Sequence, residues 1–126
     1  KKTYVQNQIL GRALLESVLF YDGKCIFTTV TIDEMEFYGV TGRELGGIVE
    51  QLRLTDGVEV AIFLYQTGEE EYKVSLRSKK KIDVAAIATQ FGGGGHVRAA
   101  GYTAKGSVYQ IINSIGELIE KQYNAM

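Results

Sequence analysis

One stretch of this 126-residue chain is unlike the rest: GGGGHVRAAG, at residues 92–101. Four consecutive glycines cost conformational entropy on folding, so a compact domain that keeps them needs positive φ angles, the absence of side chains, or both. Backbone N–H groups can converge on an anion only where no Cβ blocks the approach, and a run of glycines can form such a nest. His96 adds a hydrogen-bond donor beside the run. The stretch therefore predicts a phosphate-binding loop made of Gly92, Gly93, Gly94, Gly95 and His96.

A flexible linker or a tight turn between a helix and a strand is the alternative interpretation of the glycine run. Both ends of the run are anchored, however, by a predicted helix that ends at Phe91 and by an apolar segment at 99–102. The phosphate loop of NTPases and the dinucleotide fingerprint lie between a strand and a following helix, whereas this run follows a helix. Neither pattern is complete, because Val97 stands where the spacing G-x-G-x-x-G requires glycine.

A second candidate segment lies upstream, where residues 72–77 alternate strictly between two kinds of side chain. The alternation predicts a strand with Ser75 and Arg77 on the same face. Beside a phosphate nest, Arg77 becomes a candidate for a two-pronged clamp on an anion. Ser78 and Arg98 complete the set of candidate phosphate-binding residues, and the lysines at 79–81 would attract an anionic ligand.

Patterns of apolar residues and helix caps predict the remaining elements and an α+β, or mixed α/β, fold class. We expect a mixed sheet that includes a hairpin, packed by amphipathic helices, with the glycine-rich loop after a short helix. The expected helices cover residues 4–18, 33–37, 42–53, 84–91 and 107–119, and the expected strands cover 18–21, 25–31, 58–66 and 72–77.

Composition and charge indicate which classes of protein this chain can belong to. With 45% hydrophobic and 23% charged residues, 126 residues are enough for one domain with a real core. The formal net charge of −1 opposes a protein that coats nucleic acid non-specifically. Residues 77–105 nevertheless hold six basic residues and one acid, so the distribution predicts a local anion site on an otherwise acidic body.

Several chemistries find little support in the sequence. One cysteine and one histidine cannot form an intramolecular disulfide or a Cys/His zinc site. A triad could be drawn from Ser75 or Ser78 with His96 and Asp83, but no nucleophile elbow accompanies it. No catalytic or metal-binding residue is therefore assigned. The chain lacks an apolar run long enough for a membrane span and lacks a signal segment, so we expect a cytoplasmic protein.

These motifs together resemble the DHH-associated C-terminal domain of the DHH phosphoesterase superfamily, most closely its oligoribonuclease and pAp-phosphatase branch. The resemblance is carried by the glycine-histidine motif with AAG at 99–101 and by KVSLRS at 73–78. It continues in IDV at 82–84, in GIV at 47–49 and in GVEVA at 57–61, so it covers nearly the whole chain.

The resemblance implies a role for the chain. In that family a separate N-terminal domain with Asp and Asp-His-His motifs binds two manganese ions and hydrolyses phosphoesters, and this chain has none of those motifs. Residues 1–126 would then be a single substrate-binding domain of a longer enzyme, inactive alone and without a cofactor of its own. The parent would be a manganese-dependent hydrolase of short oligoribonucleotides or 3′-phosphoadenosine 5′-phosphate. The match of motifs places Arg77, Ser78, the glycine amides and His96 on the substrate.

Other functions stay open at this point. A cyclic-dinucleotide phosphodiesterase shares the glycine-histidine loop, although the Ala-Ala-Gly that follows here is unusual for it. A non-catalytic RNA-binding module, like the related domain of alanyl-tRNA synthetases, would need a broadly basic surface. The expected partners are a short RNA or phosphoadenosine nucleotide and the N-terminal domain of the same chain, with a homodimer as a further partner to test. A domain that serves dimerisation alone would leave the four glycines unexplained.

Overall fold

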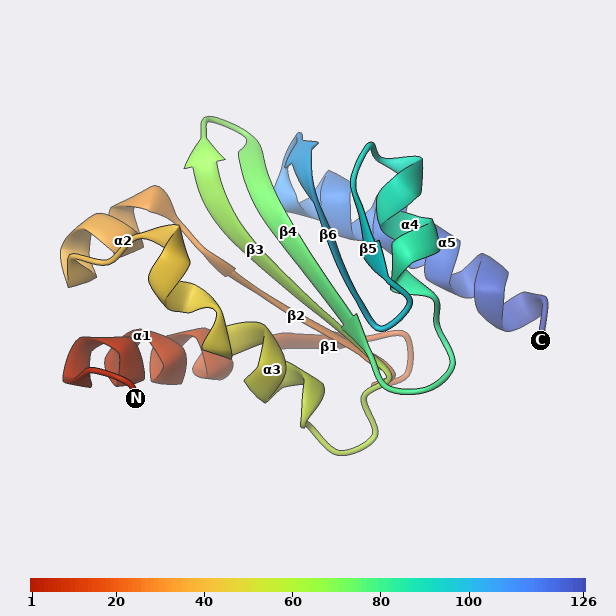
Figure 1. The fold of residues 1–126 in the computed structure, drawn as a ribbon, viewed down its shortest axis with the longest axis horizontal. Helices are drawn as coiled ribbons and strands as arrows, with labels where there is room; N and C mark the ends of the chain where they lie inside the picture. Colours follow the sequence, from red (N-terminus) through yellow and green to blue (C-terminus); the bar gives the residue numbers. More distant parts are fainter.

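A computed structural model describes all residues from 1 to 126 and shows one six-stranded sheet with helices on both faces (Figure 1). The strand order is β1-β2-β3-β4-β6-β5, in which β2 and β3 are parallel and all other neighbours are antiparallel. The strands are Val18–Phe20 (β1), Cys25–Val30 (β2), Val60–Gly68 (β3), Glu71–Ser78 (β4), Gly94–His96 (β5) and Ala99–Lys105 (β6). The helices are Tyr4–Leu15 (α1), Ile32–Tyr38 (α2), the 3-10 helix Gly42–Leu45 (η1), Gly47–Arg53 (α3), Val84–Gln90 (α4) and Val108–Asn124 (α5). The predicted α+β class with a mixed sheet is therefore confirmed.

The two faces of the sheet carry two separate cores. Strand β3 is buried on both faces over 60–64, so its alternate side chains contribute to both. On one face Val60, Ile62 and Leu64 pack with residues of β4, β6, α4 and α5. On the other face Ala61 and Phe63 pack with residues of α1, α2, η1 and α3. Figure 1 shows α1 to α3 gathered over β2, β3 and the neighbouring part of β4, so they leave β6 and β5 at the far end of their face uncovered.

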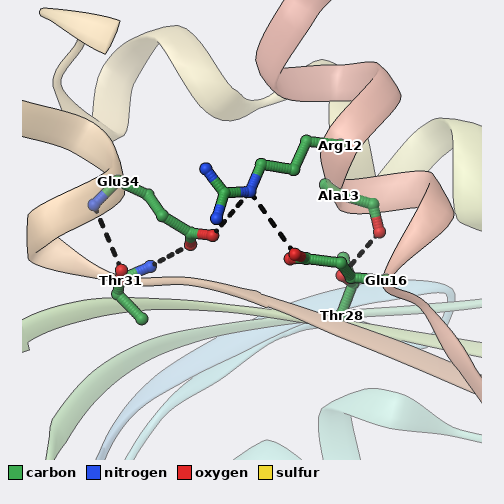
Figure 2. A network of polar contacts seen from close by, with 6 residues as sticks. All are labelled: Arg12, Ala13, Glu16, Thr28, Thr31 and Glu34. Carbon is green, nitrogen blue, oxygen red and sulfur yellow. Dashed lines mark hydrogen bonds and ion pairs between the residues drawn. The ribbon is translucent and has the colours of Figure 1, made fainter. Parts of the chain in front are cut away.

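Polar contacts attach α1 to this second core (Figure 2). The buried hydroxyl of Thr28 on β2 donates to the carbonyl of Ala13, with 2.7 Å between the oxygens. The Arg12 Nε lies 3.0 Å from a carboxylate oxygen of Glu34, a residue that also closes the capping box of α2. These contacts connect α1 to β2 and α2 at the end of the sheet away from the glycine run.

The predicted capping boxes at Thr3, Thr41 and Ser107 are all present. Several boundaries were wrong, including the end of the last helix, which continues to Asn124 rather than ending at residue 119. The first helix ends at Leu15 rather than at residue 18, because Val18 already pairs with Phe27 in the β1–β2 hairpin. The helix expected over 42–53 is divided into η1 and α3 at Gly46, a residue of low helix propensity.

The expected glycine-rich loop is also different in the structure. Gly94, Gly95 and His96 form the short edge strand β5, which pairs with β6 through a two-residue turn at Val97 and Arg98. Phe91, Gly92 and Gly93 connect α4 to this strand, so only two of the four glycines lie in a loop. The conformation is thus a hairpin at the sheet edge, with its turn held by two hydrogen bonds: Val84 N–H to the Val97 carbonyl and Ser78 N–H to the Arg98 carbonyl.

Candidate functional site

Arg77 and His96 lie in one cross-strand row of the sheet. Ala99 on β6 is the register partner of Arg77 on β4 and also of His96 on β5. Directly opposed residues of neighbouring strands have their side chains on the same face. Two strand spacings separate the Cα atoms of Arg77 and His96 by about 10 Å, a gap that a ligand phosphate and the long arginine side chain can bridge. Tertiary pairing thus brings together the two strongest candidates from the sequence.

The next row toward the middle of the sheet consists of small residues. Ser75, Gly101 and Gly94 are register partners across β4, β6 and β5. All three are partly exposed, because α1 to α3 do not cover this part of the face. We call the surface formed by these two rows the open face; its residues are Ser75, Arg77, Gly94, His96, Ala99 and Gly101.

Charged neighbours hold Arg77 in place at the edge of the open face. Its Nε donates to the Glu50 carboxylate of α3 at 3.0 Å, and one of its terminal nitrogens donates to the Leu76 carbonyl at 3.0 Å. The hydrogen bond from Arg53 is the main reason why the pKa of Glu50 is lowered; desolvation opposes it, and the hydrogen bond from Arg77 adds to it. Glu50 is therefore an ionised partner that orients the guanidinium of Arg77.

A pocket of about 360 Å³ opens beside this arginine, and we call it the Arg77 pocket. Four of its side chains are basic and one, Glu50, is acidic, which favours an anion. The lining residues are Glu50, Arg53, Arg77, Ser78, Lys79, Arg98 and Ala99.

Ser78 and Arg98, two of the predicted site residues, have structural partners. Ser78 points to the α4 side of the sheet, is 3% exposed, and donates its hydroxyl to the Ile82 carbonyl at 2.6 Å. The Arg98 guanidinium donates to the carbonyls of Ile82 and Lys80 in the β4–α4 connection. Both residues therefore fix the segment that follows β4, and both also line the Arg77 pocket.

The four glycines serve different purposes. The N–H groups of Gly92 and Gly93 already donate to the carbonyls of Thr89 and Ala88 at the end of α4, so these two amides are occupied. Gly92 has a φ of +88° and Gly95 a φ of +144°, and at Gly93 a Cβ would overlap the Gly101 carbonyl. Positive φ angles and missing side chains are thus both required, as predicted. Their effect, however, is to let β5 pack closely against β6. We therefore expect an anion to contact mainly the side chains of the open face, rather than the amides of Gly92 and Gly93.

Sequence reasoning missed Glu59, a buried carboxylate that is bound by backbone N–H groups of this chain. Glu59 is 9% exposed, and its carboxylate accepts hydrogen bonds from the backbone N–H groups of Lys80, Lys81 and Ile82, the shortest being 2.7 Å. Desolvation raises the pKa of Glu59, but the backbone hydrogen bonds together lower it by more than desolvation raises it. The pKa of Glu59 therefore lies below its ordinary value. The available signal was a single charged residue inside the apolar run 58–64.

Replacing Glu59 with glutamine should lower the free energy of unfolding by about 1–3 kcal/mol, because buried N–H groups lose a charged acceptor. The depressed pKa means that this stabilisation is present above the ordinary glutamate pKa and is lost as the pH falls through the folded-state value. Urea denaturation at several pH values measures both effects. Glu69→Gln, at an exposed turn position, is the matched control and should change little. Equal stability of the two variants would contradict this role of Glu59.

The structure gives no support to triad or thiolate chemistry. Asp83 caps α4 through the Ala86 N–H, and no hydrogen bond links it, His96 or either candidate serine to another member of the triad. Burial raises the pKa of the Cys25 thiol to about 12, which keeps it protonated. No group of three or more His, Cys, Asp or Glu side chains has the arrangement of a metal site. The family resemblance places the two manganese ions in a separate N-terminal domain, and no cluster of such side chains in this chain would hold them.

Comparison with known proteins identifies a matching family and a related protein. A model described as the DHHA1 domain matches residues 22–122. A 55-residue segment is 47% identical to the bifunctional oligoribonuclease and PAP phosphatase NrnA of Thermus thermophilus, which corresponds to 44% of this chain and 17% of that protein.

Solved structures share the fold. An exopolyphosphatase-related protein from Bacteroides fragilis matches with a TM-score of 0.85 and 23% identity, over 96% of this chain and 36% of that chain. The pGpG-specific phosphodiesterase PggH from Vibrio cholerae matches with a TM-score of 0.59 and 10% identity, over 95% and 39% respectively. The chain thus spans well under half the length of each of these relatives. None of its helices combines the length and the apolar character that a membrane crossing requires.

Proposed function

Because the chain belongs to the DHHA1 domain family, as its motifs predicted, we propose that it is the substrate-binding part of a longer phosphoesterase and that its open face binds a nucleotide phosphate. The substrates we propose are short oligoribonucleotides and 3′-phosphoadenosine 5′-phosphate, supported by the 47% identity of a segment to a bifunctional oligoribonuclease and PAP phosphatase.

The observation that carries the proposal is the meeting of Arg77 and His96 in one row of an uncovered sheet face. The row of small residues beside it, Ser75, Gly101 and Gly94, lets a ligand approach the backbone closely. A cation and an imidazole donor above a surface without bulky side chains form a site for a flat or extended anion.

Arg77 would bind the phosphate with the guanidinium nitrogen that neither Glu50 nor the Leu76 carbonyl occupies. Glu50 keeps the guanidinium oriented before the ligand arrives, which reduces the entropy lost on binding. His96 is exposed on the edge strand and would donate a hydrogen bond from the opposite side.

The hydrolytic step belongs, in this proposal, to the N-terminal domain of the parent protein, with two manganese ions that activate water. The present chain would hold the substrate's phosphate toward that domain and would be inactive by itself. We propose a cytoplasmic setting for the parent enzyme, in keeping with its nucleotide substrates.

Titration of the 126-residue chain with 3′-phosphoadenosine 5′-phosphate, followed by amide chemical shifts, tests the site. We expect shifts at residues 94–101 and at Ser75 and Arg77, and their loss in His96→Ala, because a hydrogen-bond donor to the phosphate is removed. A cyclic dinucleotide serves as the comparison ligand, and stronger shifts with it would favour the cyclic-dinucleotide alternative. Shifts confined to the α4–α5 side, or unchanged shifts in His96→Ala, would contradict the site.

A further inference from the structure

A second pocket, of about 320 Å³, lies next to the Arg77 pocket, beyond the end of β4. Lys79 lines both pockets, so the two are neighbours joined through this residue. We call the second one the lysine pocket; its lining residues are Lys24, Gly57, Val58, Glu59, Lys79, Lys80, Lys81 and Tyr123.

The lysine pocket carries an excess of positive charge. Four lysines and one carboxylate line it, and every salt bridge in the structure involves an arginine, so none of these lysines has a carboxylate within 4.0 Å. The carboxylate, Glu59, is directed to the backbone N–H groups of residues 80–82. Lys79 donates to the Thr55 carbonyl, and the Lys24 ammonium lies 5.1 Å from the centre of the Tyr123 ring. Neither contact neutralises a charge.

The segment bearing the lysines is held from two sides. Glu59 binds its N–H groups, and Arg98 binds the carbonyls of Lys80 and Ile82. Backbone groups are thereby satisfied inside the protein, while the side chains of Lys80 and Lys81 are exposed. The lysines are presented on a fixed backbone, which lowers the entropic cost of binding an anion.

We propose that the lysine pocket binds the successive backbone phosphates of a single-stranded oligonucleotide whose terminal phosphate lies at Arg77. The inference rests on the proposed function and adds to it a second subsite, which is filled by linear oligonucleotides longer than a dinucleotide. From Arg77 to Lys81 the chain spans at most about 14 Å, so a short strand can contact both pockets. The net charge of −1 is consistent with a short basic track rather than a broad nucleic-acid surface.

The test compares a 5′-phosphorylated hexanucleotide RNA with 3′-phosphoadenosine 5′-phosphate as ligands of this chain, by calorimetry at several salt concentrations. The double variant Lys80→Ala, Lys81→Ala should weaken hexanucleotide binding roughly 10-fold at low salt and make the slope of log K against log salt shallower by about 1.4. Binding of the mononucleotide should stay within twofold of the original. The fold should be retained, because Glu59 and Arg98 contact the backbone of this segment rather than these side chains.

Lys105→Ala, Lys121→Ala is the matched control, since both residues are exposed lysines outside the two pockets. Unchanged hexanucleotide affinity in the Lys80, Lys81 variant would overturn the inference, as would an equal loss for both ligands or no hexanucleotide binding at millimolar concentration. Failure of the proposed function has a different signature: Arg77→Ala would then leave the affinity of the mononucleotide unchanged.

Discussion

Replacing Arg77 with alanine in the full-length parent enzyme should lower kcat/KM for short oligoribonucleotides roughly 100-fold, the effect typical of removing one fixed donor from a site of charge stabilisation. Arg77 is the arginine of the open face, and its guanidinium is pre-oriented by Glu50 and the Leu76 carbonyl. An alanine would leave the open face with small residues and one histidine, and without the guanidinium that faces the phosphate, although Arg53, Lys79 and Arg98 remain in the neighbouring pocket. Steady-state kinetics with a short RNA measures the loss.

Arg77→Lys separates charge from geometry, because lysine keeps the charge but lacks the planar fork that can hold Glu50 and a phosphate together. We expect an intermediate rate for it. Lys121→Ala, on α5 at the opposite face of the sheet, is the control for loss of one positive charge and should retain the original rate. If Arg77→Ala and Lys121→Ala have equal rates, the phosphate does not bind at the open face.

Gly95→Ala should lower the free energy of unfolding of the chain by about 3 kcal/mol, because the residue combines a backbone conformation and a contact that no side chain tolerates. Its φ is +144°, and a Cβ would lie 2.6 Å from both the Ala100 Cα and the Ala99 carbonyl oxygen. Because both neighbours are backbone atoms of β6, the strain cannot be relieved by a rotamer change, and β5 has to move. Chemical denaturation measures the loss.

Gly94→Ala is the matched control for this experiment, one residue away in the same strand. A Cβ at Gly94 would meet nothing within 4 Å, and its φ is not positive. Its effect on unfolding should therefore stay within about 0.5 kcal/mol. Similar losses in the two variants would mean that β5 is not packed as the structure shows.

Much of the fold followed from local sequence. Caps at Thr3, Thr41 and Ser107 marked three helix starts correctly, because the side chain that caps a helix lies within three residues of its partner. The alternation at 72–77 placed Ser75 and Arg77 on one face, since the period of a strand is a local property. The helix boundary at Gly46 and the strands at 94–96 and 99–105 were missed, because tertiary pairing and packing decide such elements.

By itself the sequence determined the class of the fold, the family, and the segments from which the open face is built, because periodicity, capping and a motif of glycines and histidine are written in neighbouring residues. Only the tertiary structure decided which of those segments meet. The register of β4, β6 and β5 put Arg77 and His96 in one row, turned Ser78 away from them, and joined the amides of residues 80–82 to Glu59. Pairing register and burial depend on contacts between residues far apart in the chain, and no local pattern carries that information.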